Sequence, residues 1–183
     1  MHSRLTSLQR AEAPVLIFFT FWLLWVLVAP FTLPAGSVTD LSGKVSSIDN
    51  MDQIEKMNPF AAAIYWLGDA NCHQLASRSY YLNGNQLPFC ARDLGIFIGM
   101  VLGLALAFVI KVRPPLLLVI LGLVPMAMDG GIQLLTDYES TNPMRLVTGA
   151  LAGVSIAFLI HLIAINIRDT RSISPPTDRH DTK

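Results

Sequence analysis

Four long apolar segments constrain what this chain can fold into. They cover residues 13–33, 94–110, 116–135 and 145–167. A helix rises 1.5 Å per residue, so roughly 20 apolar residues cross a hydrocarbon core of about 30 Å. Only 14% of the residues are charged, whereas soluble domains carry about 25%. The sequence therefore predicts an all-α fold, a polytopic membrane helix bundle with four transmembrane helices.

The first apolar segment also admits a second interpretation, a cleaved signal peptide, because basic residues precede it. Its apolar run exceeds the roughly 7–15 residues usual for such peptides. The sequence Val28-Ala29-Pro30 is also a poor cleavage site. We therefore expect the segment to be retained as a membrane anchor.

Polar stretches between the apolar segments divide the chain. The expected divisions are a cytoplasmic N-terminus (1–12), a first transmembrane anchor (13–34), an external polar loop (35–58), a membrane domain (59–167) and a disordered cytoplasmic tail (168–183). Each boundary falls where charged residues, proline or glycine interrupt the apolar composition.

Two smaller elements are expected before the second span. Asn58-Pro59 is typical of a helix start, and a helix over 59–78 would lie at the membrane interface or be partly re-entrant; a plain surface helix fits the sequence equally well. Asn83-Gly84 then predicts a short outer hairpin. In that register Leu82 faces Asn85.

The distribution of lysine and arginine predicts the orientation of the chain in the membrane. Four spans place both termini on one side with eight basic residues, and five lie on the other side. Because basic residues accumulate on the cytoplasmic side, we expect a multi-pass plasma-membrane protein with cytoplasmic termini. The lipid bilayer is its expected partner. The formal net charge is zero, and the chain has no basic stripe, which argues against nucleic-acid binding.

Small residues recur every fourth position in two of the spans. Gly95, Gly99 and Gly103 form one stripe, and Gly149 and Gly153 form the other. Such stripes let helix backbones approach closely. They predict tight packing inside the bundle, and they could also support a homo-oligomer through glycine-rich helix faces. In the third span, Pro125 is expected to cause a kink.

Polar side chains are expected to gather at the external ends of the spans. Asp129 is expensive to bury in an apolar helix unless a partner neutralises it. We expect it to pair with Arg145 or Arg92, although the pair could serve packing alone. His161, near the other end, is expected to be a packing histidine. The candidate ligand-binding residues are Arg78, Arg92, Asp129, Gln133, Asn142 and Arg145.

The two cysteines, Cys72 and Cys90, admit three interpretations. Two cysteines in an external loop can form a disulfide. Alternatively, Cys72, His73, Cys90 and Asp93 supply donor atoms of the kind that zinc uses. The third interpretation is a redox pair that exchanges electrons with a quinone. The sequence leaves all three open.

The same residues resemble those of one family. The matching positions are Cys72-His73-Gln74, Arg78-Ser79, Pro88 to Gly95, Gly99, Pro125 to Gln133, Ser140-Thr141-Asn142, Arg145 and Thr148-Gly149. Over about residues 60–160 the chain resembles the prokaryotic membrane proteins catalogued as domain of unknown function 2085. The resemblance implies a small polytopic membrane protein and no particular reaction. Members similar to this chain often carry a second cysteine at the position of Asp93.

Two classes of function remain compatible with this sequence. One is a transport or binding protein for a small or anionic ligand, held at an outward-facing polar site. The other is an enzyme, either a metal-dependent one acting on a lipid or prenyl phosphate or a thiol redox protein. Because the sequence shows no arrangement of a nucleophile and a base, we favour transport or binding.

Overall fold

Long apolar helices form the body of the computed structural model, which describes residues 2–110 and 113–173. Four segments are long and apolar enough to cross a membrane: Glu12–Thr32, Ala91–Ile110, Leu116–Leu135 and Asn142–Thr170. The helical elements are α1 (His2–Val28), η1 (Ala29–Thr32), α2 (Met51–Ile54), α3 (Pro59–Asn71), η2 (Ala76–Arg78), α4 (Ala91–Ile110), α5 (Leu116–Leu121), α6 (Val124–Leu135) and α7 (Asn142–Ile173). The predicted four-span helical fold is confirmed.

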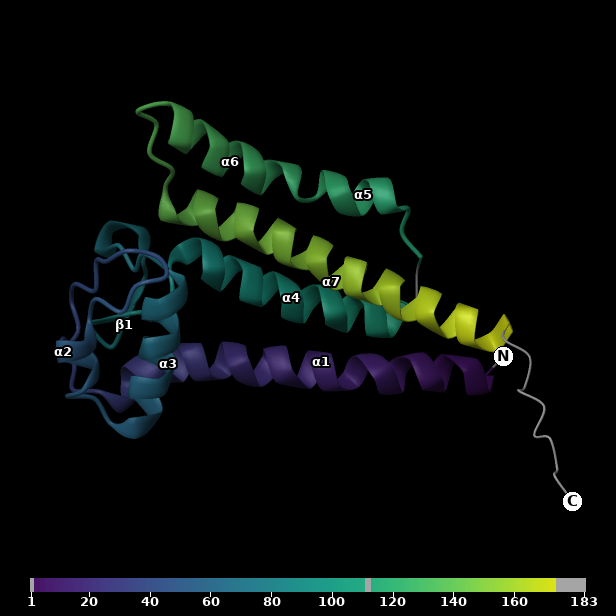
Figure 1. Cartoon of the computed structure of the whole chain (residues 1–183), viewed down its shortest axis with the longest axis horizontal. Coiled ribbons are helices and arrows are strands. Elements are labelled where there is room, and N and C mark those ends of the chain that lie inside the picture. The colour runs from purple at the N-terminus through teal and green to yellow at the C-terminus, as the bar shows by residue number, and fades with distance from the viewer. Residues whose placement is uncertain (1, 111–112, 174–183) are drawn as a thin grey trace, which may run out of the picture.

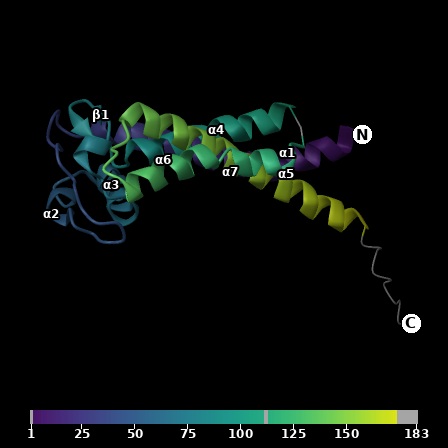
Figure 2. The ribbon, with the colours of Figure 1, turned by 90° about the horizontal axis from the view of Figure 1, so that it is seen from above.

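The spans lie along one common long axis, as Figures 1 and 2 show. Helices α4 and α7 form the most extensive contact, α1 packs mainly against α4, and α5 and α6 pack against α7. The remaining elements, between α1 and α4, form a cap at one end of the bundle (Figure 1). The start of α1 and the end of α7 both lie at the opposite end.

The contact between α4 and α7 depends on the two glycine stripes. A Cβ atom at Gly95 or Gly99 would overlap a backbone carbonyl oxygen of α7, and one at Gly149 or Gly153 would overlap a carbonyl oxygen of α4. The stripes are therefore close-contact faces, as the sequence predicts. Because they face each other inside one chain, they are not free surfaces through which a second copy could dock.

The third span is interrupted between α5 and α6. Pro125 has no N–H group, so it cannot donate the helical hydrogen bond that residue i makes to residue i−4, here Leu121. Helix α5 ends at Leu121 and α6 starts at Val124. The predicted irregularity at Pro125 is thus a break of two residues, Gly122 and Leu123.

The cap has an apolar core of its own. Buried side chains of the segment predicted as a polar loop, including Val38, Leu41 and Ile54, pack with Tyr65 of α3. Strands β1 (Tyr81–Leu82) and β2 (Asn85–Gln86) pair antiparallel, with Leu82 opposite Asn85. The expected hairpin and its register are confirmed.

Helix α3 is shorter than the predicted helix over 59–78. It starts as expected, because the Asn58 side chain accepts a hydrogen bond from Ala61 N at 3.0 Å, and it lies across the end of the bundle (Figure 1). It ends at Asn71, since Cys72 takes an extended backbone conformation. The chain then turns through Gln74, whose φ is 47°.

Both terminal helices extend beyond their predicted limits. Helix α1 begins at His2, inside the stretch expected to precede the membrane, and α7 continues to Ile173, inside the stretch expected to be a disordered tail. Once a helix is nucleated, each added residue gains one hydrogen bond for the one residue whose backbone is fixed, so the ends can propagate into polar sequence. Residue 1 and the rest of that tail, 174–183, lie outside the described residues.

One buried polar pair joins α1 to α7 near the end of the bundle opposite the cap. His161 Nδ1 lies 2.5 Å from Glu12 Oε1, and both side chains are less than 5% exposed. The sequence predicts a packing histidine at 161, and the structure adds a carboxylate partner 149 residues away. This pair anchors the first span to the bundle, because separating the two groups would leave each in apolar surroundings.

Candidate functional site

The cap brings the two cysteine-bearing segments together through glutamine side chains. Gln74 Nε2 donates to the Pro88 carbonyl oxygen at 2.7 Å, and Gln86 Nε2 donates to the Gln74 carbonyl oxygen at 2.6 Å. Gly68 permits this approach, since a Cβ there would overlap Pro88 O. The turn after α3 is thereby fixed against the segment that leads into α4.

This packing creates a cluster of sulfur and carboxylate groups at the start of α4. Potential ligand atoms of Cys72, Cys90 and Asp93 all lie within 4.8 Å of one another. Cys90 Sγ lies 3.3 Å from Asp93 Oδ2, and both cysteines are free thiols. The three residues could hold a metal ion. His73, the fourth residue of the predicted metal set, is exposed and does not belong to this cluster.

The two thiols are electrostatically unequal. The hydrogen bond with Cys90, reinforced by burial, raises the pKa of the Cys72 thiol above its ordinary value. The same hydrogen bond, accepted by sulfur, lowers the pKa of the Cys90 thiol. Cys90 is therefore the thiol that loses its proton first.

A second cluster, of charged and amide groups, lies beside the thiols. Arg92, in the first turn of α4, donates from Nη2 to Asp129 Oδ2 of α6 at 2.5 Å. The Asp129 side chain is 5% exposed and that of Arg92 is 27% exposed. The structure thus gives Asp129 an arginine partner, and of the two expected arginines it is Arg92, not Arg145, that forms the pair.

Arg145 is the most deeply buried of the three arginines near the cap, with a side chain 3% exposed. Its Nη1 donates to Asn142 Oδ1 at 3.2 Å. Its nearest carboxylate is Glu139 Oε1, 3.6 Å from Nη2, on a side chain that is 60% exposed. The buried positive charge is therefore only partly compensated, since a solvated carboxylate neutralises a charge weakly.

Gln133 lies between Arg78 and Arg145. With its amide oxygen turned toward Arg78, Gln133 accepts from Nη1 at 3.0 Å and from Nη2 at 2.7 Å. In the other orientation its oxygen lies 3.5 Å from Arg145 Nη2. The shorter contacts favour the first orientation, which is assigned from the hydrogen-bond network. Arg78 Nε also donates to Glu139 Oε1 at 3.3 Å.

The six predicted ligand-binding residues form two neighbouring groups, the Arg92–Asp129 pair and a set in which Arg78, Gln133, Asn142 and Arg145 contact one another or Glu139, from the turn before α7. The charge of Arg145 interacts with those of Arg92 and Asp129, so the two groups form one electrostatic network. A cavity of about 140 Å³ lies between this network and the thiols. Its lining residues are Cys72, His73, Gln74, Leu75, Arg78, Cys90, Arg92 and Arg145.

The charges in this arginine cavity do not balance. Three guanidinium groups line it or adjoin it, and the carboxylates in contact with them are those of Asp129 and Glu139. Among the described residues, the buried side-chain polar atoms without a hydrogen-bond partner are Arg92 Nε, Asp129 Oδ1 and Ser140 Oγ. Arg92 itself lines the cavity, and arginine presents several N–H groups in one plane that can hydrogen-bond an oxyanion.

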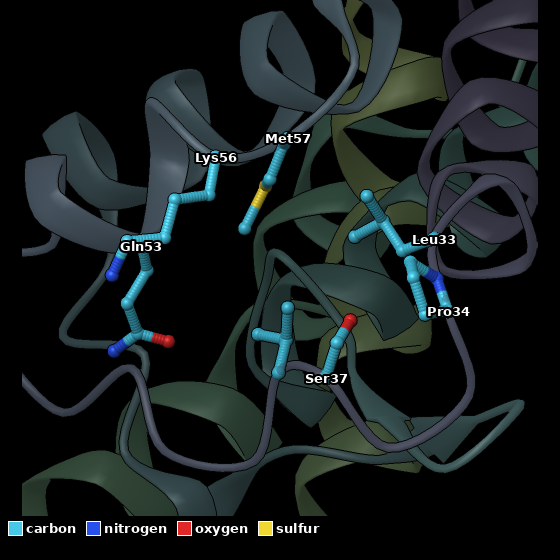
Figure 3. A pocket seen from close by; sticks show the side chains of 7 residues that line it. Leu33, Pro34, Ser37, Gln53, Lys56 and Met57 are labelled. Carbon is cyan, nitrogen blue, oxygen red and sulfur yellow. The ribbon is translucent and has the colours of Figure 1, made fainter.

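Two other cavities lie outside the arginine network. One, of about 310 Å³, has Asp93 in a wall otherwise formed by Asn71, by Phe89 before α4, and by apolar and aromatic residues of α1, α3 and α4. The other, of about 220 Å³, is inside the cap. Figure 3 shows Gln53 and Lys56 on the wall opposite Leu33 and Pro34. Neither cavity brings together more than one charged side chain.

The sequence analysis did not identify two residues that help to build this site, Glu139 and Gly68. Glu139 directly precedes Ser140 in a short turn, so its position beside the site could have been inferred. Gly68 carries no such signal, because its role depends on the distant contact with Pro88.

Comparison with known proteins is consistent with this description. Residues 72–159 match the family described as "Predicted membrane protein (DUF2085)". An uncharacterized protein of Methanocaldococcus jannaschii is 30% identical over 151 residues, which cover 80% of this chain and 87% of that protein. An uncharacterized protein of Methanothermobacter thermautotrophicus is 34% identical over 95 residues, covering 50% of this chain and 86% of that protein. No solved structure matches the chain.

Proposed function

This chain belongs to the DUF2085 family of predicted membrane proteins, and on that premise we propose that it binds or transports a small oxyanion. The proposed ligand site is the arginine cavity between the thiols and the charged network. Arg78, Arg92 and Arg145 hold the ligand. Asp129, Gln133 and Asn142 orient the guanidinium groups toward it.

The observation that carries this proposal is the convergence of three guanidinium groups on one small cavity. Arginines repel one another, and burial of Arg145 adds a desolvation penalty that the exposed Glu139 offsets only in part. An anion in the cavity would reduce both the repulsion among the arginines and the desolvation penalty of Arg145. Binding sites commonly retain such uncompensated charge for the ligand to neutralise.

The shape and chemistry of the cavity favour a compact oxyanion. Guanidinium groups match the oxygens of phosphate or sulfate with paired hydrogen bonds. A volume of about 140 Å³ is below the roughly 300–1,000 Å³ of ligand pockets for larger molecules.

Isothermal titration of the metal-free protein with inorganic phosphate tests this proposal. We expect saturable binding, and Arg145→Gln should weaken it about 10- to 100-fold, because a hydrogen bond to a charged group contributes about 1.5–3 kcal/mol. Arg78→Gln, at a more exposed position, should weaken it without leaving a buried charge unpaired. Arg113→Gln removes an exposed arginine, and its affinity should equal that of the wild type. Equal phosphate affinities of the wild type and the three variants would show that phosphate does not bind at this site.

The proposal includes an orientation in the plasma membrane. The cap and the arginine cavity face outward, and both termini are cytoplasmic, following the basic-residue asymmetry. Reporter fusions after Arg113 and after Arg171 should therefore report a cytoplasmic position, and a fusion after Asp137 an external one. An external report after Arg171 would contradict this topology and the outward-facing site.

The second candidate function is a metal-dependent enzyme acting on a lipid or prenyl phosphate. The cluster of Cys72, Cys90 and Asp93 favours it, because thiolate and carboxylate ligands are typical of zinc. Elemental analysis of the purified protein distinguishes this candidate: stoichiometric zinc favours the enzyme, whereas metal-free protein with two oxidised cysteines favours a disulfide or a thiol redox role.

A further inference from the structure

The metal-ligand cluster and the arginine cavity share residues. Cys72 and Cys90 supply two of the three clustered ligand atoms, and both residues also line the arginine cavity. Asp93, the third ligand, lines the neighbouring aromatic cavity instead. A metal ion held by the cluster would therefore lie in the wall of the proposed anion site.

Only three protein ligands are clustered, which suits a metal with an open coordination position. Zinc sites that keep one position for water or substrate typically have three protein ligands, whereas structural sites have four. His73 cannot be counted as the fourth, because it is exposed and outside the cluster. The remaining ligand must come from solvent or from a molecule in the cavity.

The charges permit a metal beside three arginines. Binding of a divalent ion converts both thiols to thiolates, so the two protons released balance the charge of the ion. Among the described residues Asp93 forms no ion pair. The metal therefore adds little net repulsion to the guanidinium groups across the cavity.

We infer that the protein binds a thiolate-held divalent metal of the zinc type together with an oxyanion, one oxygen of which completes the coordination of the metal. This inference rests on the proposed anion site. The other oxygens accept hydrogen bonds from the guanidinium groups of Arg92 and of Arg145 or Arg78. Each ligand then provides part of the binding site of the other, so the affinity for each rises when the other is bound.

Cobalt(II) is a suitable probe, because its thiolate complexes absorb in the near ultraviolet and its visible bands respond to the fourth ligand. The reduced full-length protein in detergent would be titrated with cobalt(II), with and without saturating inorganic phosphate. We expect a thiolate-to-cobalt band, a cobalt affinity about tenfold higher with phosphate and a shift of the visible bands. Absence of the band, or a cobalt affinity that phosphate does not change, would overturn the inference.

Three variants separate this inference from the proposed function. Asp93→Asn, at a position outside the arginine cavity, should weaken cobalt binding and still bind phosphate without metal. Arg78→Gln should keep the cobalt affinity measured without phosphate and lose most of the tenfold increase, whereas Arg113→Gln should behave as the wild type. If phosphate bound the metal-free protein but did not change its cobalt affinity, only this inference would be refuted. If phosphate bound neither the metal-free nor the cobalt-loaded protein, the proposed function would be refuted as well.

Discussion

Gly99→Ala is expected to destabilise the bundle by more than about 3 kcal/mol. A Cβ atom at this position would overlap the carbonyl oxygen of Ala150, a backbone atom in the adjoining helix. A flexible side chain could move aside, but helix backbone cannot, so α4 and α7 would have to separate. Overpacking of a core typically costs about 1–3 kcal/mol, and separation of two helices adds the loss of their shared contact. Unfolding in mixed detergent micelles would measure the change.

Gly131→Ala is the matched control. A Cβ at Gly131 meets no atom within 4 Å, and alanine favours a helix over glycine by about 0.5–1 kcal/mol. This variant should therefore be as stable as the wild type or slightly more stable. Leu104→Ile, a volume-conserving change at a buried site, should cost less than about 1.5 kcal/mol. Equal unfolding of the Gly99 and Gly131 variants would show that the glycine stripe does not hold α4 and α7 together.

Removing one partner of the Arg92–Asp129 pair is expected to have the second large effect. Either Arg92→Gln or Asp129→Asn should cost about 3–5 kcal/mol, because each leaves a charge in a largely dry environment without its counter-ion. The double variant should cost less than the sum of the two single changes, since it leaves no lone charge. The coupling energy is obtained from the free energies of unfolding of the wild type, the two single variants and the double variant.

The exposed pair between Arg113 and Asp169 provides the control for this comparison of single and double variants, which is a double-mutant cycle. Its atoms are 2.6 Å apart, but the side chains are 55% and 42% exposed. Solvated pairs typically contribute about 0.2–1 kcal/mol, so this cycle should give a small coupling energy despite similar geometry. If the two cycles gave the same coupling energy, the Arg92–Asp129 contact would be a solvated surface contact rather than a buried anchor of the site.

The parts of the fold that follow from local sequence were predictable. The length of each apolar run determines the spans, Pro125 determines the break in the third span, and Asn83-Gly84 determines the hairpin. The glycine stripes were recognised as contact faces, because small residues at fourfold spacing have few other uses in a membrane helix. Each of these features depends on residues close together in the chain.

Features that depend on distant contacts were not predictable. The end of α3 is set by the extended Cys72 and by the hydrogen bond from Gln74 to Pro88, not by any helix-breaking residue. The pairing of Glu12 with His161 joins residues 149 positions apart. The sequence likewise limited Asp129 to two arginine partners, and only the packing of α6 beside the first turn of α4 selects Arg92.

The candidate site shows the same division between local and distant information. Orientation and span length were enough to predict that Arg92, Asp129 and Arg145 gather at one end of the bundle. The contribution of Glu139 and the separation of His73 from the metal-ligand cluster depend on side-chain directions that no periodicity encodes. The cavity itself arises only where the cap meets the bundle.

The central claim, that the arginine cavity binds an oxyanion, is tested most directly by locating such an ion. A structure of the purified protein with selenate, an oxyanion whose selenium scatters X-rays anomalously, would serve this purpose. We predict a selenium peak in the cavity, with oxygens within hydrogen-bond distance of the Arg92 and Arg145 guanidinium groups. If selenate occupied other sites on the protein fully and the cavity showed no selenium peak, the account would be contradicted.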